Sequence, residues 1–342
     1  MIKHISHITQ IIGFLCLFSI HVMGQDPVFS QFYNTHLQLN PAMAGNTVGP
    51  NFQLNYRNQW PGLSKIYNTY ALSYDQAMDK LNSGIGGMIL TDNAGDGTLV
   101  TTTIRGMYSY KLKLDNDLYL KGGFDVGFTN MGLDWNKLQF GDAIDPRSGG
   151  LSPGGLPLPS AEVNPGNNTK NYFTVGSGLV LYNPKYSIGI SLANLNTPDI
   201  SFLSDRSSQD VGGTALPVRI TIHAGNQITL DPGNKNQSGT FIALNTIYTR
   251  QGPFNQLNLG GYLSFRDVIM GVGFRHSFLN GDAIIPSIGF RKHFLKLTYS
   301  FDLTTSELGL GQGGSHEIGI GINFDYLYPK KQNYNDCFAI FR

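Results

Sequence analysis

The chain is poor in cysteine and in charged residues. It has 2 cysteines among 342 residues, and charged residues make up 14% of it, with 24 Lys and Arg against 23 Asp and Glu. This balance argues against nucleic acid as a partner, and the 12% of aromatic residues argues against a disordered chain. Beyond the N-terminal region no run approaches 18 consecutive apolar residues, which excludes a helical membrane protein.

The one long apolar stretch predicts a secretory signal peptide. Lys3 precedes a mostly apolar stretch (11–20), and a small residue stands before position 25. This pattern is typical of a signal removed after residues 1–24, and the stretch is too short to span a membrane comfortably as an anchor. Removal takes Cys16 with it and leaves Cys337. We therefore expect no intrachain disulfide in the mature protein, and an unpaired thiol in the tail rather than a cross-link to a partner.

Period-two alternation of apolar and polar residues is frequent, whereas helical periodicity is hard to find. In SHEIGIGINF (315–324) the isoleucines from Ile318 onward share one face, while Glu317, two glycines and Asn323 share the other. LKLTYSFDL (295–303) repeats the pattern. The alternation predicts strands with one apolar face.

The same reading gives fourteen candidate strands along the chain, an even number. They are 51–58, 68–76, 83–92, 98–112, 117–130, 171–182, 185–194, 217–229, 239–250, 255–264, 267–278, 283–292, 295–302 and 315–324.

Two all-β folds explain these strands, and their length favours one of them. In a soluble sandwich the apolar faces meet a second sheet, whereas in a transmembrane barrel they meet lipid. Most of the strands approach the ~9–11 residues that a tilted strand needs to cross a bilayer. Aromatic residues also gather near strand ends, as interfacial girdles require: Tyr108, Tyr110, Tyr119, Tyr172, Tyr182, Tyr186, Phe278 and Phe294. We predict an outer-membrane β-barrel of about fourteen antiparallel strands.

Loop lengths support the barrel independently. If the chain starts in the periplasm, even-numbered connections are periplasmic turns and odd-numbered ones face outside. The connections at 183–185, at Arg266 and at His293 are even and tight, whereas the fifth (131–170) and the seventh (195–216) are odd and long. The sequence therefore predicts an integral protein of the outer membrane of a diderm bacterium.

The candidate catalytic and ligand-binding motifs fit structural roles better than chemical ones. DNAGDG (92–97) lacks the spacing of a calcium loop and suits a hairpin turn, and the glycines of SGIGG (83–87) suit close packing or lumen clearance. HEIG (316–319) lacks the second histidine of a zinc protease. We expect no enzyme activity, no cofactor and no metal.

Several charged residues fall on the polar faces of the strands. Such groups can tune a pore, but more often they pair with each other across a barrel interior. They are Arg57, Arg105, Lys121, Asp125, Arg219, Arg275, Lys296 and Asp302.

Five segments resemble one known family. QDPVFSQFYNTHLQLNPAMAG (25–45), YRNQW (56–60) and SHEIGIGINFDY (315–326) look like the PorP/SprF outer-membrane proteins associated with type IX secretion and gliding motility. FGDAIDPRSG (140–149) and SLANLNTPDISF (191–202) look like middle loops of that family. Arg57, Gln59 and Trp60 fall in its first-hairpin motif. The tail reads CFAIFR, where the family often has Cys-Pro and aromatics.

The resemblance implies a non-enzymatic barrel that helps a type IX cargo, such as a large gliding adhesin, to reach or stay on the surface by binding its C-terminal sorting domain. Two alternatives remain: a translocon or motor-linked component that binds a periplasmic peptidoglycan-associated lipoprotein, and a small-solute porin. Other type IX components are further expected partners. The residues expected to face cargo lie in the fifth and seventh connections: Trp135, Phe140, Asp142, Asp145, Arg147, Phe202, Asp205 and Arg206.

The chain thus divides into a signal peptide (1–24), an N-terminal periplasmic segment (25–50), the barrel (51–326) and a C-terminal tail (327–342). The N-terminal segment has two possible positions, across the periplasmic mouth or inside the lumen as a plug, and the loop parity favours the mouth. Asn40 stands before a proline, which favours an extended bend over a helix end. The residues expected to make its contacts or its turn are Phe29, Phe32, Tyr33, Asn40, Pro41 and Gly45.

Overall fold

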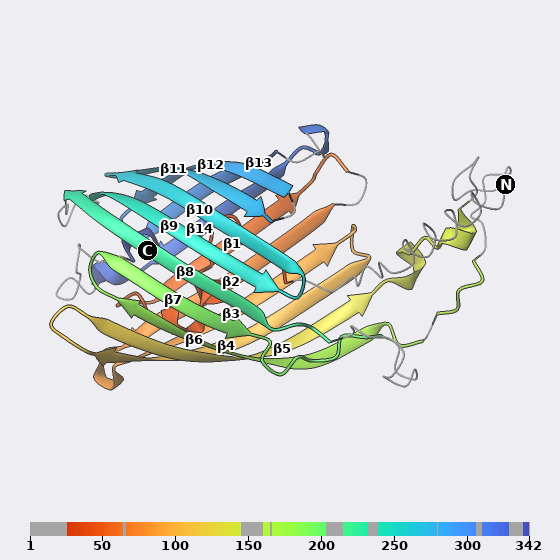
Figure 1. The fold of residues 1–342 in the computed structure, drawn as a ribbon, viewed down its shortest axis with the longest axis horizontal. Coiled ribbons are helices and arrows are strands. Elements are labelled where there is room, and N and C mark those ends of the chain that lie inside the picture. The colour runs from red at the N-terminus through yellow and green to blue at the C-terminus, as the bar shows by residue number, and fades with distance from the viewer. Residues whose placement is uncertain are drawn as a thin grey trace, which may run out of the picture.

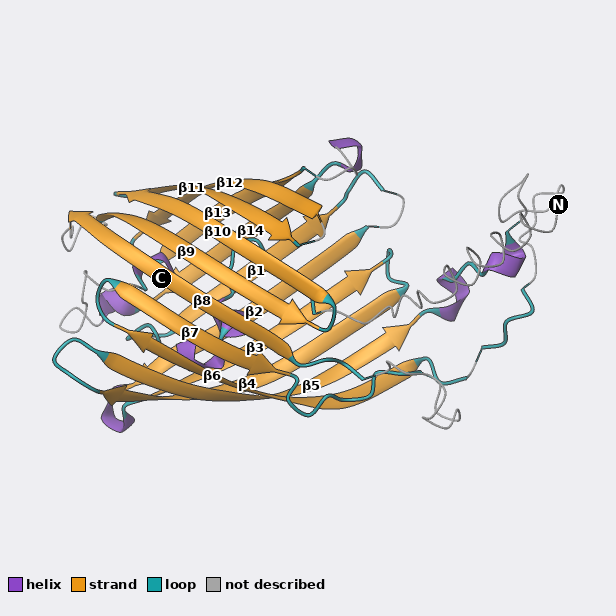
Figure 2. Cartoon of the chain, viewed as in Figure 1, coloured by secondary structure: helices purple, strands orange, loops and turns teal. Residues whose placement is uncertain are grey.

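The computed structural model is a closed antiparallel barrel in which β1 pairs with β14, and every other strand pairs with its neighbours in the chain (Figure 1). The structure describes residues 26–63, 66–144, 160–164, 166–202, 215–231, 239–278, 280–305, 310–327 and 338–341. The wall consists of strand alone, and helix is confined to short turns (Figure 2). Among the described residues, no helix is long and apolar enough to cross a membrane.

The fourteen strands lie where the alternation predicted them, within about three residues at each end. Their bounds are β1 Asn51–Gln59, β2 Tyr67–Met78, β3 Ser83–Ala94, β4 Leu99–Lys113, β5 Tyr119–Leu133, β6 Thr169–Tyr182, β7 Tyr186–Ala193, β8 Arg219–Asp231, β9 Thr240–Gln251, β10 Phe254–Phe265, β11 Val268–Ser277, β12 Asn280–Lys292, β13 Leu295–Thr304 and β14 Ser315–Asn323.

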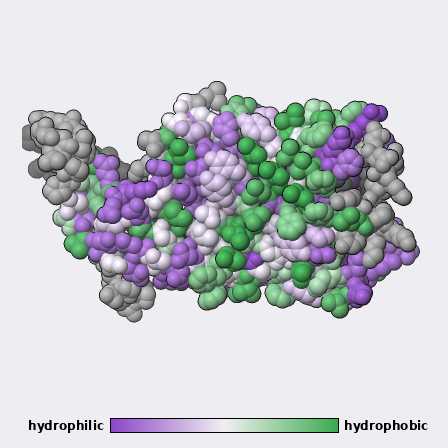
Figure 3. All heavy atoms as spheres, turned by 180° about the vertical axis from the view of Figure 1, so that it is seen from behind, coloured by the Kyte–Doolittle hydropathy of each residue, from purple (hydrophilic) through white to green (hydrophobic). Residues whose placement is uncertain are grey.

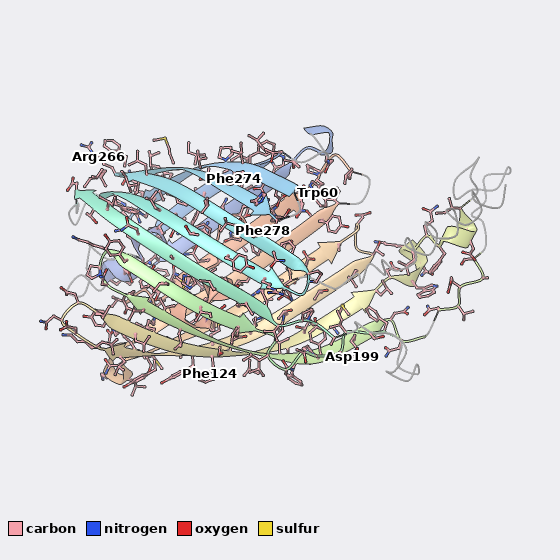
Figure 4. The ribbon with its side chains drawn as sticks, viewed as in Figure 1. Trp60, Phe124, Asp199, Arg266, Phe274 and Phe278 are labelled. Atoms are coloured by element: carbon pink, nitrogen blue, oxygen red, sulfur yellow. The ribbon has the colours of Figure 1, made fainter. Side chains whose placement is uncertain are left out.

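Burial is inverted relative to a soluble protein, because polar side chains are inside and apolar ones outside. Along β5, Lys121 and Asp125 are buried, while Phe124 and Val126 are 53% and 49% exposed. Phe124 projects from the outer surface of the barrel (Figure 4). One face of the molecule shows an apolar area between hydrophilic ends (Figure 3). An apolar belt of this kind is stable only against lipid.

The two ends of the barrel differ in their connections. One end carries tight turns, including those at Arg266 and His293, where φ is +54° at each residue. The other end carries the fifth and seventh connections, and the fifth projects beyond the wall (Figure 1). In outer-membrane barrels the short turns face the periplasm and the long loops face outside. We call the two ends periplasmic and outer accordingly.

Part of the predicted aromatic girdle lies elsewhere. Tyr110, Tyr186, Phe278 and Phe294 are each between 47% and 58% exposed, as a girdle requires. The strand alternation turns three other tyrosines inward. A position near a strand end is therefore a poor guide to the face on which a residue lies. These are Tyr172, together with Tyr119 and Tyr182, whose rings stack at 5.4 Å.

The loop parity favoured a position across the periplasmic mouth for the N-terminal segment. This prediction is wrong. Residues 26–50, here called the lumenal segment, run inside the barrel and carry α2 (His36–Leu39) and the 3-10 turn η1 (Pro41–Met43). Asn40 is extended, as predicted, with φ −159° and ψ 122°, yet it also ends α2. Other short 3-10 turns are η2 (Asp79–Leu81), η3 (Trp135–Lys137), η4 (Gly141–Ala143), η5 (Leu310–Gln312), η6 (Asp325–Leu327) and η8 (Ala339–Phe341).

Candidate functional site: the filled lumen and the outer loops

The lumenal segment runs the length of the barrel interior. Near the outer end, the Asp26 carboxylate lies 3.2 Å from a guanidinium nitrogen of Arg219, at the start of β8. Near the periplasmic end, the Gly45 N–H donates to Asp75 at 3.0 Å, and Lys121 Nζ donates to the Ala44 carbonyl at 2.8 Å. The chain therefore descends from the outer mouth to the periplasmic mouth before β1 begins.

Four buried charged residues of the wall hold the part of the lumenal segment that is nearer the outer mouth. This outer charge cluster consists of Arg57 (β1), Arg275 (β11), Asp302 (β13) and Glu317 (β14), all no more than 6% exposed. Both arginines pair with Asp302, and Arg57 also pairs with Glu317 at 3.2 Å. Arg275 also pairs with Asp282 at 2.7 Å, so each guanidinium group has two carboxylate partners, and a buried charge requires such pairing.

The outer charge cluster binds backbone and hydroxyl groups of the lumenal segment. The Ser30 and Gln31 N–H groups donate to the Glu317 carboxylate at 2.8 and 3.0 Å. The Ser30 hydroxyl donates to Asp302 at 2.8 Å and accepts from Arg57 at 2.6 Å. Hydrogen bonds to ionised groups are roughly twice as strong as neutral ones, so the cluster fixes the segment in position.

Asn40 attaches the part of the lumenal segment that is nearer the periplasmic mouth to the opposite wall. Its side-chain amide donates to the carbonyls of Leu179 (β6) at 3.2 Å and Ile190 (β7) at 3.1 Å, and its oxygen accepts from the Ala42 N–H at 2.9 Å. β7 lies seven positions from β14 around the ring of fourteen strands. The segment is therefore held on both sides of the lumen.

Glycines of the wall make room for the segment. A Cβ at Gly123 (β5) would lie 2.5 Å from the Ala42 nitrogen, and one at Gly84 (β3) would meet the Ala44 carbonyl. A Cβ at Gly178 would collide with the side chain of Asn40. The glycines of SGIGG that face inward thus serve clearance, one of the two roles proposed from the sequence.

Aromatic residues of the segment form the apolar part of the filling. Tyr33 is 2% exposed and packs edge-on against Tyr262 of β10 at 5.1 Å, and Phe32 lies 6.0 Å from the same ring. Phe29 belongs to a second cluster with Leu37. Gly45 takes a φ of +67° at the turn toward β1.

The C-terminal residues 338–341, here called the C-terminal turn, pack against the lumenal segment and the wall at the periplasmic end. Phe338 packs on Tyr182 at 4.8 Å, and Phe341 lies 6.3 Å from Phe32. Lys296 Nζ donates to the Ile340 carbonyl at 3.3 Å. The sequence reading missed this contact, although the aromatic composition of the last residues was a signal. Cys337 lies outside the described residues.

The residues of the first-hairpin motif separate in space. Arg57 points into the lumen as part of the outer charge cluster, and Gln59 ends β1 at the outer rim. Trp60 has a φ of +58°, packs on Tyr67 at 5.6 Å, and its N–H donates to the carbonyl of Gly314. The first and thirteenth connections are thereby joined at the rim.

The long outer loops present aromatic and polar groups beyond the barrel. The rings of Trp135 and Phe140 pack 5.0 Å apart in the fifth connection. Lys170 at the start of β6 pairs with Asp199 at 2.9 Å, which ties the seventh connection to the outer end of β6. Phe202 is partly exposed. Four other residues expected to face cargo lie outside the described residues: Asp145, Arg147, Asp205 and Arg206.

Asp142 ties two parts of the fifth connection together. Its carboxylate accepts from the Ala161 N–H at 2.6 Å and from the Ser160 hydroxyl at 2.8 Å. These hydrogen bonds, the one from the Ala161 N–H above all, hold the pKa of Asp142 below its usual value of 3.8.

We expect this tie to weaken in acid. A depressed carboxyl pKa contributes stability that is complete above the usual value and is lost as pH falls through the folded-state value. The protection factor of the Ala161 amide against hydrogen exchange should therefore drop below about pH 4. Asp142→Ala, which removes the acceptor, should show low protection at every pH, and unchanged protection of the native loop in strong acid would contradict the assignment.

The metal-site candidates in the sequence belong to turns and strands of the barrel. DNAGDG forms the turn between β3 and β4, with positive φ at Gly95, Asp96 and Gly97, as the hairpin reading predicted. Among the described residues, no group of three or more His, Cys, Asp or Glu is placed to hold a metal.

Comparison with known proteins identifies the family and little else. No curated protein matches the chain. Solved structures that match are other barrels: the toluene transporter TbuX of Ralstonia pickettii (10% identity, 85% of this chain and 94% of that one, TM-score 0.47) and Omp33 of Acinetobacter baumannii (8%, 82% and 100%, 0.43). A FadL homologue of Pseudomonas aeruginosa matches at 11% identity, 83% and 93% coverage and a TM-score of 0.43. These likenesses are too remote to carry an argument about function.

The family match covers most of the chain. Residues 22–322 match the family described as type IX secretion system membrane protein PorP/SprF. The match includes the lumenal segment and the strands of the barrel up to β14. The chain belongs to the PorP/SprF family of type IX secretion system membrane proteins and is an integral outer-membrane protein.

Proposed function

We propose that this barrel is a non-enzymatic support for the secretion or surface anchoring of a type IX cargo, such as a gliding adhesin, whose C-terminal sorting domain it binds through its outer loops. The observation that carries the proposal is the filled lumen. A protein whose interior is occupied by its own chain from mouth to mouth acts through its rims, because its interior is not free for traffic.

The filling argues against the small-solute porin. A porin needs a continuous aqueous path, and its charged wall groups must face that path. Here Arg57, Arg275 and Asp302 face each other and Ser30 instead. Arg219 pairs with Asp26 of the lumenal segment.

The outer loops suit a protein partner. Partly exposed aromatic side chains that are held by their own neighbours supply binding area at a low cost in conformational entropy, and Trp135 and Phe140 form such a pair. Ile144 and Val163 of the same connection are 47% and 82% exposed. Aromatic residues are also enriched at the centres of protein interfaces.

We expect the double variant Trp135→Ala/Phe140→Ala to lose surface cargo while the barrel still assembles. Surface labelling should show one adhesin-like cargo strongly reduced and other type IX substrates unchanged. The matched control is Asn116→Ala, an exposed change in the periplasmic β4–β5 turn. A general export defect in the double variant would contradict cargo binding and favour a translocon component.

One observation favours the periplasmic alternative, a translocon or motor-linked component that binds a peptidoglycan-associated lipoprotein. A hollow of about 370 Å³ opens at the periplasmic mouth between the lumenal segment, the C-terminal turn and Lys111 and Lys121. If that role holds, Lys111→Glu should abolish co-purification of a periplasmic lipoprotein and leave surface cargo bound.

A further inference from the structure

The membrane-facing surface of the wall carries a groove on one side of the barrel. It has a volume of about 770 Å³ and runs from the periplasmic ends of β6 and β7 to the middle of β11. This volume is within the ~300–1,000 Å³ typical of sites for small molecules. It lies outside the lumen and away from the outer loops, so it is independent of the proposed cargo site.

Small residues of neighbouring strands form the floor of the groove. Ala224 (β8) pairs with Thr246 (β9), and Gly261 (β10) pairs with Leu244 of the same β9 strand. Ala224 and Thr246 are exposed on the outer face. Ala224 and Thr246 place two short side chains next to each other, whereas the exposed Leu244 and Leu259 stand beside Gly261 and Thr246 and divide the floor.

Larger apolar side chains form the walls. Ile188 of β7 stands on one side, and Val272 and Phe274 of β11 stand on the other, with exposures of 55%, 59% and 41%. Figure 4 places Phe274 on the β11 side. These residues belong to the apolar belt, so the medium that meets the groove is the acyl region of the bilayer.

The periplasmic end of the groove is polar. Asn183 and Asn226 line it there, and Tyr186 stands beside them at the start of β7. Lys185, in the β6–β7 turn, is exposed next to this end. An apolar groove that ends in amides and a cation at the interface matches a lipid with an anionic headgroup, because the headgroup lies at the same level as the turn.

We propose that this groove binds a glycerophospholipid of the periplasmic leaflet, with acyl chains over Ala224, Thr246 and Gly261 and its phosphate beside Lys185. The lipid fills a hollow in the wall that would otherwise lose dispersion contacts.

The test is the full-length protein extracted from its outer membrane in mild detergent, washed, and assayed for bound phospholipid by native mass spectrometry and phosphorus analysis. Gly261→Trp fills the floor, and a Cβ there meets only the end of the Leu244 side chain, at 3.6 Å, so we expect the variant to fold. The matched control is Gly106→Trp on β4, a membrane-facing glycine with nothing within 4 Å of its Cβ position.

The native protein and Gly106→Trp should retain phospholipid after washing, and Gly261→Trp should retain about tenfold less, which corresponds to a loss of ~1.4 kcal/mol of binding. Lys185→Glu should lower the anionic share of the retained lipid. Equal retention in Gly261→Trp, or an acylated polypeptide or a second copy of the chain retained in place of phospholipid, would overturn the proposal.

Discussion

Deletion of residues 26–44 is expected to turn a silent barrel into a conducting one. In a planar bilayer the native protein should give no steady conductance, whereas the deletion variant should give stable, long-lived openings. Eight strands are just filled by wall side chains and sixteen leave an aqueous channel, so a fourteen-stranded barrel without its filling holds water. The polar wall, including Lys121 and Asp125, would then be hydrated.

A substitution in the wall tests the same point without shortening the chain. Gly123→Leu places a side chain where Ala42 lies, and it should displace the segment and produce conductance. Gly122→Leu is the matched control, because Gly122 faces the membrane one residue away and its Cβ position meets Leu179 only at 3.5 Å. A silent Gly123→Leu barrel that is folded, together with a silent deletion variant, would mean that the segment does not close the lumen.

The strands were predictable because one face of each is under a strong constraint. A strand in a bilayer must show an apolar side chain at every second position, and a slip of one residue would bury that face. For this reason 185–194 was expected and Tyr186–Ala193 is observed, and 315–324 was expected where Ser315–Asn323 is observed. The constraint is local, so the sequence alone carries it.

The path of the lumenal segment was not predictable in the same way. Loop parity places the start of β1 at the periplasmic end. It fixes the position of residue 50 only, so the preceding residues can lie either across the mouth or inside the lumen. What holds the segment inside is a set of contacts with distant residues, such as Ser30 with Glu317 and Asn40 with Ile190. No spacing within residues 25–45 reveals those partners.

The outer charge cluster shows the same limit. Arg57 and Glu317 lie opposite each other only because β1 pairs with β14, so their contact follows from closure of the barrel. Arg275 joins them from β11 through Asp302. The sequence reading expected the inward charges to pair, and Arg57, Arg275 and Asp302 do so, but it could not say with which residues.

Asp302→Ala is expected to destabilise the barrel by about 3–5 kcal/mol, the cost of breaking a buried ion pair by removing one partner. Asp302 is 1% exposed and is the carboxylate that Arg57 and Arg275 share. Its loss leaves Arg57 with Glu317 as its one remaining ion-pair partner among the described residues and Arg275 with the partly exposed Asp282, and it also removes the acceptor of the Ser30 hydroxyl. The lumenal segment therefore loosens as the wall weakens.

The measurement is urea unfolding in lipid vesicles, with Asp199→Ala as the control. Asp199 pairs with Lys170 at 2.9 Å, but its side chain is 57% exposed, so its removal should cost only about 0–1 kcal/mol. A large shift of the unfolding midpoint for Asp302→Ala and a small one for Asp199→Ala would show that burial, and not the ion pair as such, makes the cluster important. Equal midpoints for the two variants would contradict the role given to Asp302.

Because Ser30 is held by the same cluster, the Asp302→Ala barrel should also show brief conducting events in the bilayer, and these should be absent from Asp199→Ala.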